Sequence, residues 1–307
     1  MIGLYVQHDY VRAVDIVKKR NRYVLNGLSG QPVHLPTPDR LRPFEENEEE
    51  EYVGNIKDTL RAILSARGFA SRDVSIAIDI RNAFIQTVPF DGNFSKENVK
   101  KIIQWELGQY FTGYDESSFL FDTYNPGFNP ARDTSPRFIY TAVFRSYIHL
   151  LQQGVRSCHL KLHSINVDQF AIENILRLAA GQSKRERLHA VCFRHDDIVY
   201  CSLLWNHRLV RYREYTLDES HTPDERLAMF LSSTPGGQKH VEQRIYYHPE
   251  DPDTRKAVEE RTGWQFSRFN AFEQLTVSRK AKRSLPSMFD SQELFAPAIS
   301  VAINGGR

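Results

Sequence analysis

Two polar segments of the sequence hold the residue types that bind metal ions, His195-Asp196-Asp197 and His248-Pro249-Glu250-Asp251. Imidazole and carboxylate groups ligate divalent cations, but the metal sites that a sequence reveals place these groups at regular spacings such as His-Glu-x-x-His. Neither segment has such a spacing. We therefore interpret both segments as polar hairpin turns and predict no metal site.

The first strand-like run, Ile2 to Val6, carries no acidic residue. Polynucleotidyl transferases of the ribonuclease H type need a carboxylate on this strand, because converging acidic groups hold their paired metal ions. Tyr5 occupies that place. The sequence also contains no P-loop, nucleophile elbow or protein-kinase motif, so none of these catalytic sites is predicted.

Composition gives the broad class of the protein. The chain has 307 residues, is 41% hydrophobic and carries a formal net charge of +2, which is ordinary for a soluble protein of two or three domains. This small net charge gives no argument for a nucleic acid or an anionic membrane as partner. Because no apolar run reaches the roughly 18 residues that a membrane span needs, we expect a cytoplasmic protein.

The three cysteines, Cys158, Cys192 and Cys201, lie in apolar, strand-like runs. Such positions are typical of buried, reduced thiols. If Asp196-Asp197 forms a two-residue hairpin turn, Cys192 and Cys201 face each other across it, and a disulfide between them is the alternative.

A meander of three strands opens the chain and returns later. The first copy covers Ile2 to Val6, Val11 to Val17 and Tyr23 to Leu28, and the second begins at Leu188 with the runs HAVCF, IVYCSLLW and LVRYREYTL. Each run alternates or is apolar, and polar turns separate the runs. Two such meanders, each followed by helical sequence, indicate a duplicated α/β unit.

The remainder of the first unit follows in order. The proline-rich and acidic segment Ser29 to Glu51 is interpreted as a solvated loop, Tyr52 to Arg67 as an amphipathic helix, and Asp73 to Ile80 as a strand. A strand from Cys158 to Val167 and a helix from Asp168 to Ala180, with Asp168 as its N-cap, complete the unit.

Between these parts lies a segment with a different order of elements, which we interpret as an inserted subdomain over residues 81–157. It contains strands Phe84 to Phe90, Ser118 to Tyr124 and Arg137 to Phe144, a helix capped by Ser95, and a short helix Tyr147 to Gln153 closed by Gly154. The first unit is then residues 1–80 plus 158–183.

The second unit is residues 184–307. After its meander, Thr222-Pro223-Asp224-Glu225 has the pattern of a capped helix start. Four further elements follow: a strand from Gln243 to Tyr247, a helix from Asp253 to Thr262 ended by Gly263, a strand from Trp264 to Phe269, and a last helix from Gln292 to Ile303.

This order resembles the actin-like (ribonuclease H-like) fold as built in the PilM proteins of type IV pilus assembly, with duplicated βββαβα units and an inserted α+β subdomain. The segment between Leu217 and Gln243 is too short for the usual fourth subdomain, so we expect this subdomain to be reduced. Local matches carry the resemblance. They are the opening IGLYVQHDYVRAVDI, the run from Val74 to Pro89, the helix segment Trp105-Glu106-Leu107-Gly108-Gln109-Tyr110, Asn166-Val167-Asp168 with Ala171, and Phe269-Asn270-Ala271-Phe272.

The nucleotide-facing loops depart from the family. Where actin-like ATPases have an Asp and a Gly in the first turn, this sequence has Tyr5 and Gln7, and where the second turn has Asp-x-Gly it has Phe193, Arg194 and His195. The Gly-Gly on the adenosine side falls near His248-Pro249. The carboxylate acts through the hydration shell of Mg²⁺, and glycine lets the backbone approach phosphate. We therefore expect no nucleotide cofactor and no ATPase activity; ATP with Mg is the alternative, with Asp9, Asp196 or Asp197 as the metal-facing carboxylates.

The resemblance implies a role in assembly. PilM-type proteins lie at the cytoplasmic face of the inner membrane and bind the N-terminal cytoplasmic peptide of the membrane protein PilN, in a groove between the first subdomain and the inserted one. By analogy, the partner site would lie near Phe84 to Phe90 and Ser95 to Tyr110, with Trp105, Glu106 and Tyr110 as candidate residues. These aromatic side chains can equally pack the core of the insert. A homologue of the cytoplasmic domain of GspL, from type II secretion, is the alternative of the same class.

Overall fold

The computed structural model describes residues 1–20, 22–36, 43–89, 95–124, 137–180, 187–232, 242–248, 251–267, 270–283 and 293–304. Its strands form three sheets. The first has the order β14-β3-β2-β1-β4-β8 and the second the order β11-β10-β9-β12-β13, while a smaller sheet has the order β5-β7-β6.

The two large sheets are built in the same way. In the first, β1 (Ile2–Val6), β2 (Tyr10–Lys19) and β3 (Arg22–Pro32) are antiparallel, and β4 (Asp73–Ile78) and β8 (Lys161–Val167) continue in parallel. In the second, β9 (Arg187–His195), β10 (Ile198–Trp205) and β11 (Arg208–Thr216) form the meander, and β12 (Glu242–His248) and β13 (Gln265–Phe266) are the parallel strands. The duplication predicted from the two meanders is confirmed.

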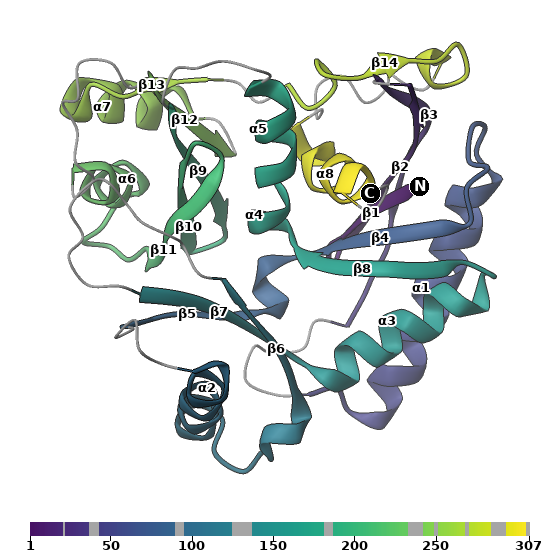
Figure 1. Ribbon diagram of the computed structural model, residues 1–307, viewed down its shortest axis with the longest axis horizontal. Helices are drawn as coiled ribbons and strands as arrows, with labels where there is room; N and C mark the ends of the chain where they lie inside the picture. The colour runs from purple at the N-terminus through teal and green to yellow at the C-terminus, as the bar shows by residue number, and fades with distance from the viewer. Residues whose placement is uncertain are drawn as a thin grey trace.

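The sheets and helices alternate in layers (Figure 1). Helices α1 (Glu46–Ser65) and α3 (Arg145–Ser157) cover the outer face of the first sheet, and α8 (Ala296–Asn304), α4 (Asp168–Ala171) and α5 (Glu173–Ala180) lie between the two sheets. Helices α6 (Pro223–Ser232) and α7 (Pro252–Thr262) cover the outer face of the second sheet. Apolar side chains from both units, such as Tyr5 and Val191, share one central core.

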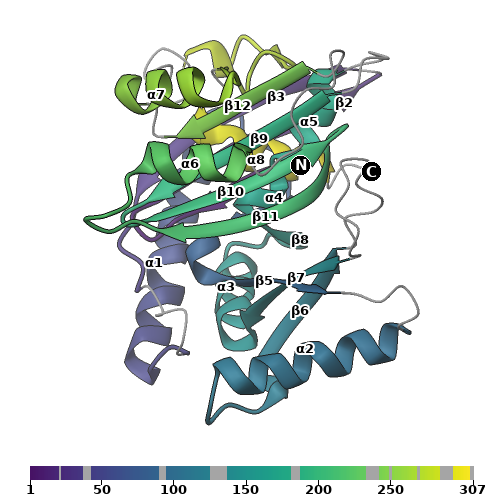
Figure 2. The same cartoon turned by 90° about the vertical axis from the view of Figure 1, so that its left-hand side faces the viewer.

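The inserted segment contains β5 (Phe84–Pro89), α2 (Lys96–Tyr110), β6 (Phe119–Tyr124) and β7 (Arg137–Phe144). Figure 2 shows α2 at the end of the molecule, away from both large sheets. The side chain of Ser95 accepts a hydrogen bond from Asn98 N, which confirms the predicted cap.

The end of the chain returns to the first sheet. Strand β14 (Thr276–Val277) pairs with β3, and α8 packs on β1, where a Cβ on Gly3 would overlap the carbonyl oxygen of Ala298. The sequence assigned these residues to the second unit because helical periodicity does not reveal which sheet a helix covers.

Three local predictions were wrong. The segment Ser29 to Glu51 is not one loop, because β3 continues to Pro32 and the acidic run forms the start of α1, where carboxylates near a helix N-terminus are favourable. Gly154 does not end a helix but lies inside α3, where the lack of a side chain lets α1 approach. The backbone N-cap of α4 is Val167 rather than Asp168, since the carboxylate of Asp168 faces Tyr5.

The helix predicted from Asp168 to Ala180 is divided at Ile172 into α4 and α5. The following predictions were correct. The turn at Asp196-Asp197 places Cys192 opposite Cys201, and both are free, buried thiols, as is Cys158 at the C-terminal end of α3. Helix α7 ends at Gly263 in the left-handed conformation, as its sequence predicts. Among the described residues, no helix has both the length and the apolar character of a membrane span.

Candidate functional site

A buried polar cluster fills the place where the β1–β2 and β9–β10 turns meet between the two sheets. Its centre is a hydrogen bond of 2.6 Å from the hydroxyl of Tyr5 to the carboxylate of Asp168, which also accepts from the backbone of Gln169. Both side chains are buried. We call Tyr5, Asp79, Arg81, Asp168 and His195 the polar corner.

Arg81 supplies the positive charge of the polar corner. It follows β4 in a short 3-10 turn (Ile80–Asn82), and its guanidinium donates to both carboxylate oxygens of the buried Asp79, at 3.0 and 2.6 Å. It also contacts Nδ1 of His8 at 2.7 Å and lies 3.6 Å from the exposed carboxylate of Asp196. Arg81 thus joins the loop after β4 to the turns of both units.

The charges of the polar corner are mutually dependent. Burial, together with the negative charge of Asp79, raises the pKa of Asp168 to about 8. Burial also acts to raise the pKa of Asp79, but the hydrogen bonds and charge of Arg81 bring it below its ordinary value. At neutral pH the pair therefore holds one ionised carboxylate, Asp79, balanced by Arg81.

Histidines complete the corner on the side of the second sheet. Burial lowers the pKa of His195, and burial, His195 and Arg12 lower the pKa of His248 to about 4, so these rings are neutral. Ligand atoms of Asp79, Asp168 and His195 lie within 4.8 Å of one another, which is close enough to surround a cation. However, Asp79 is already neutralised by Arg81, and Asp168 accepts from Tyr5.

The polar corner does not fit a nucleotide with Mg²⁺. The buried phenol of Tyr5 stands where a carboxylate would hold the hydration shell, and the amide oxygen of Gln7 is hydrogen-bonded to Arg12. The second turn presents His195 and the exposed Asp196 where glycine would let the backbone meet phosphate. Asp9 and Asp196 are exposed, and Asp196 pairs with Arg81 rather than facing a free metal position.

The structure brings together most of the residues named for these loops. Tyr5, Gln7 and His195 lie at the meeting turns, and the ring of Phe193 lies 6.4 Å from His195 and 6.5 Å from His248. Pro249 lies outside the described residues. The sequence patterns did not reveal Asp79 and Arg81. Their signal was an Asp-x-Arg sequence immediately after a buried parallel strand.

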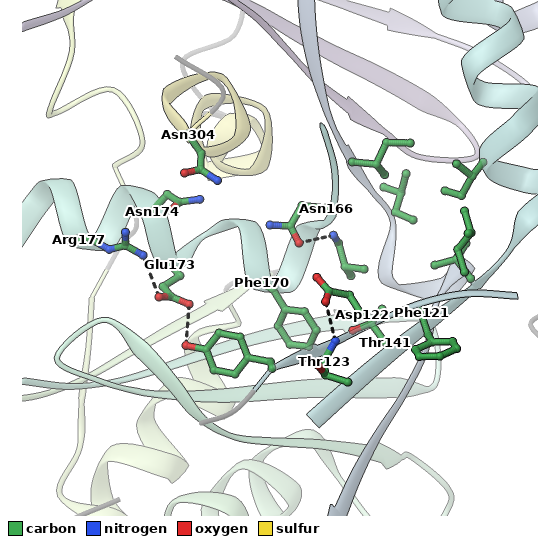
Figure 3. Close-up of a pocket in the computed structure, with 17 residues that line it drawn as sticks. Phe121, Asp122, Thr123, Thr141, Asn166, Phe170, Glu173, Asn174, Arg177 and Asn304 are labelled. Atoms are coloured by element: carbon green, nitrogen blue, oxygen red, sulfur yellow. Dashed lines mark hydrogen bonds and ion pairs between the residues drawn. The ribbon is translucent and has the colours of Figure 1, made fainter. Parts of the chain in front are cut away.

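A groove separates the insert from the first unit (Figure 3). Its cavity of about 490 Å³ is lined by β6 and β7 on one side and by β8, α4 and α5 on the other. Glu173 lies between Arg177, at 2.9 Å, and the hydroxyl of Tyr124, at 3.3 Å, at a polar end that also has Asn174 and Asn304. The rest of the wall combines apolar residues, among them Ile78, Ile148 and Phe170, with the polar residues Asp122, Thr123, Thr141 and Asn166.

Two strand edges line this groove. Among the described residues, β6 is an outer strand of the small sheet and β8 is an outer strand of the first large sheet. A second cavity of about 490 Å³ continues along β8 towards α3 and shares Ile165 with the first. An edge strand presents unpaired backbone donors and acceptors to any chain beside it.

The residues predicted for the partner site lie elsewhere, on α2. Trp105 is 66% exposed and therefore does not pack in the core, and Tyr110 is 54% exposed with its ring 4.8 Å from Phe84. Glu106 accepts a hydrogen bond of 3.0 Å from Tyr140. None of the three lines the groove, because β6 rather than β5 is the strand that borders it.

Comparison with known proteins gives structural relatives alone. No family model matches the chain, and no curated protein matches it. A chain of the PilM-PilN type IV pilus biogenesis complex superposes with a TM-score of 0.68 at 14% identity, over 100% of this chain and 98% of that one. A Bacteroides thetaiotaomicron protein of actin-like ATPase fold and unknown function has a TM-score of 0.49 at 10% identity, over 88% and 90% of the two chains. The cytoplasmic domain of EpsL from the type II secretion system of Vibrio cholerae has a TM-score of 0.46 at 7% identity, over 90% of this chain and 88% of that one.

The first of these likenesses, together with the duplicated strand order, confirms the predicted fold class. The chain has the actin-like fold, and its likeness to a chain of the PilM-PilN complex extends over its full length.

Proposed function

We propose that this chain is a non-catalytic actin-like scaffold in the assembly of a type IV pilus-like machine. In this role it docks the N-terminal cytoplasmic peptide of a PilN-like inner-membrane protein, and it reaches the membrane through that partner. The observation that carries the proposal is the groove between β6 and β8, in which two open strand edges border one cavity.

An extended peptide suits this groove. Strand addition supplies backbone hydrogen bonds, and alternate side chains of the peptide enter pockets beside the strand. The seven residues of β8 span roughly 20 Å, which matches about seven residues of extended peptide. Because the wall combines apolar residues such as Ile148 and Phe170 with polar residues such as Asp122 and Glu173, we expect the bound peptide to carry both apolar and polar side chains.

Binding to this groove is tested by titration with a peptide that represents the cytoplasmic N-terminus of the PilN-like protein from the same genome. Leu120 lines the groove and is 37% exposed, whereas Met229 on α6 is 56% exposed and lies away from it. We expect Leu120→Asp to weaken binding about tenfold or more, as loss of a buried apolar contact does, and Met229→Asp to leave it unchanged.

The variant Trp105→Ala distinguishes binding in the groove from binding at the site that the sequence predicts on α2. Weaker binding in Trp105→Ala with unchanged binding in Leu120→Asp would assign the partner to the face of α2 and overturn the groove. Absence of binding by the unmodified protein at high micromolar peptide would overturn the assembly role itself.

The absence of catalysis is tested separately. A nucleotide that binds the folded state raises its stability by about 2.7 kcal/mol at one hundred times the dissociation constant. Since the polar corner holds Tyr5 and the Asp79–Arg81 pair instead of a metal-binding turn, we expect no change of melting temperature with Mg-ATP. A clear rise would instead support a divergent ATP-binding protein.

A further inference from the structure

A small polar cavity lies at the opposite end of β9 from the polar corner. Its volume is about 200 Å³, and four segments line it: α5 with Leu176, β9 with Arg187 and His189, β12 with Arg244 and Tyr246, and the segment before β14 with Glu273 and Gln274. His189 and His195 are six residues apart on one strand, so this cavity is roughly 20 Å from the polar corner. We call it the β9–β12 cavity.

His189 is a buried polar group with unused hydrogen-bonding capacity. His189 is 4% exposed, and neither of its ring nitrogens has a hydrogen-bond partner among the described residues. The rings of His207 and Tyr246 lie 5.3 and 5.5 Å away and hold the imidazole in place. A buried polar group without a partner destabilises the fold, and a bound ligand can satisfy it.

The surroundings of His189 are cationic. Burial lowers its pKa to about 3, and its neighbours His207, Arg187 and Arg244 act in the same direction. Burial lowers the pKa of His207, and the charges of Arg187 and Arg177 lower it further. Glu273 is the acidic residue among those lining the cavity, so the described side chains favour an anion over a metal ion.

We propose that the β9–β12 cavity binds a small oxyanion of the phosphate class. Arg187 and Arg244 supply charge and planar donors that match oxyanion geometry, and the neutral imidazole of His189 supplies one N–H inside the cavity. The volume suits inorganic phosphate or the head of a phosphate monoester. Such a ligand would join the segment of Glu273 and Gln274 to the second sheet and to α5 (Figure 1).

The test is calorimetric titration of the full chain with inorganic phosphate, and in a second arm with glycerol 3-phosphate, at constant ionic strength. We expect saturable binding, weakened about tenfold or more in His189→Phe and in Arg244→Gln, since hydrogen bonds to charged groups are worth that much. Phenylalanine preserves the ring contacts with His207 and Tyr246. Glu273→Gln removes a repelling carboxylate and should tighten binding.

The matched control is Arg213→Gln, which removes an exposed strand arginine of β11 outside the cavity and should leave binding unchanged. Because His189→Phe removes two unpaired nitrogens, its melting temperature without phosphate should equal or exceed that of the unmodified protein. Tighter binding of glycerol 3-phosphate than of inorganic phosphate would identify the ligand class as phosphate monoesters, and the reverse order would identify it as free phosphate. No saturable binding of either ligand, or equal binding in His189→Phe and the unmodified protein, would overturn the proposal.

Discussion

The hydroxyl of Tyr5 and the carboxyl of Asp168, 163 positions apart, meet through a buried hydrogen bond of 2.6 Å. This bond joins the first strand of the fold to the first helix between the sheets. A phenol and a protonated carboxyl group are both neutral, so the pair can be buried at little electrostatic cost. In this neutral form the pair acts as a structural joint between β1 and α4.

Asp168→Asn tests this protonated state. The pKa of Asp168 in the folded protein, about 8, is above its ordinary value. The contribution of this carboxyl group to the free energy of unfolding is therefore complete below about pH 4, the pKa in the unfolded chain. It is lost as the pH rises through about 8. We expect the melting temperature of the unmodified protein to fall between pH 5 and pH 8 more steeply than that of Asp168→Asn. Thermal melts across this range measure the difference. Parallel profiles would mean that Asp168 is ionised in the folded protein.

Arg81→Met tests the ion pair with Asp79. It leaves a buried carboxylate without its cation, and removal of one partner from a buried pair costs about 3–5 kcal/mol. Denaturant unfolding at pH 7 should show a loss of this order. The double variant Asp79→Asn/Arg81→Met removes the stranded charge and should recover most of the loss. Equal stability of the single and double variants would show that the charge of Asp79 is solvated without Arg81.

Much of the fold could be predicted from the sequence because local patterns specify it. The meanders at Ile2 and Leu188, the cap at Ser95 and the end of α7 at Gly263 each depend on residues adjacent in the chain. The positions of β14 and α8 depend instead on contacts with the first sheet across more than 250 residues. The hydrophobic periodicity of a segment does not predict such a distant contact.

The candidate site was predictable only in part. Tyr5, Gln7 and His195 could be found because they replace residues that a known pattern requires. Arg81 could not, since its role follows from the three-dimensional meeting of Asp79, His8 and Asp196. The groove could be anticipated between two subdomains, but which strand edge borders it depends on the order β5-β7-β6, which the sequence does not specify.

Gly154→Ala tests the close approach of α1 and α3. A Cβ at this position would lie 2.5 Å from Cγ2 of Ile56. Overpacking of this kind costs about 1–3 kcal/mol, which should outweigh the gain in helix propensity of about 1 kcal/mol. Denaturant unfolding should therefore show a net loss of stability.

Gly108→Ala is the matched control for this prediction. Gly108 also lies inside a helix, α2, but a Cβ at this position would meet no atom of the described residues within 4 Å. We expect this variant to gain up to about 1 kcal/mol from helix propensity alone. In an Ile56→Ala background, Gly154→Ala should change from destabilising to stabilising, because the methyl group it meets is gone. A stabilising effect of Gly154→Ala in the unmodified protein would show that α1 and α3 are separated by more than the structure indicates.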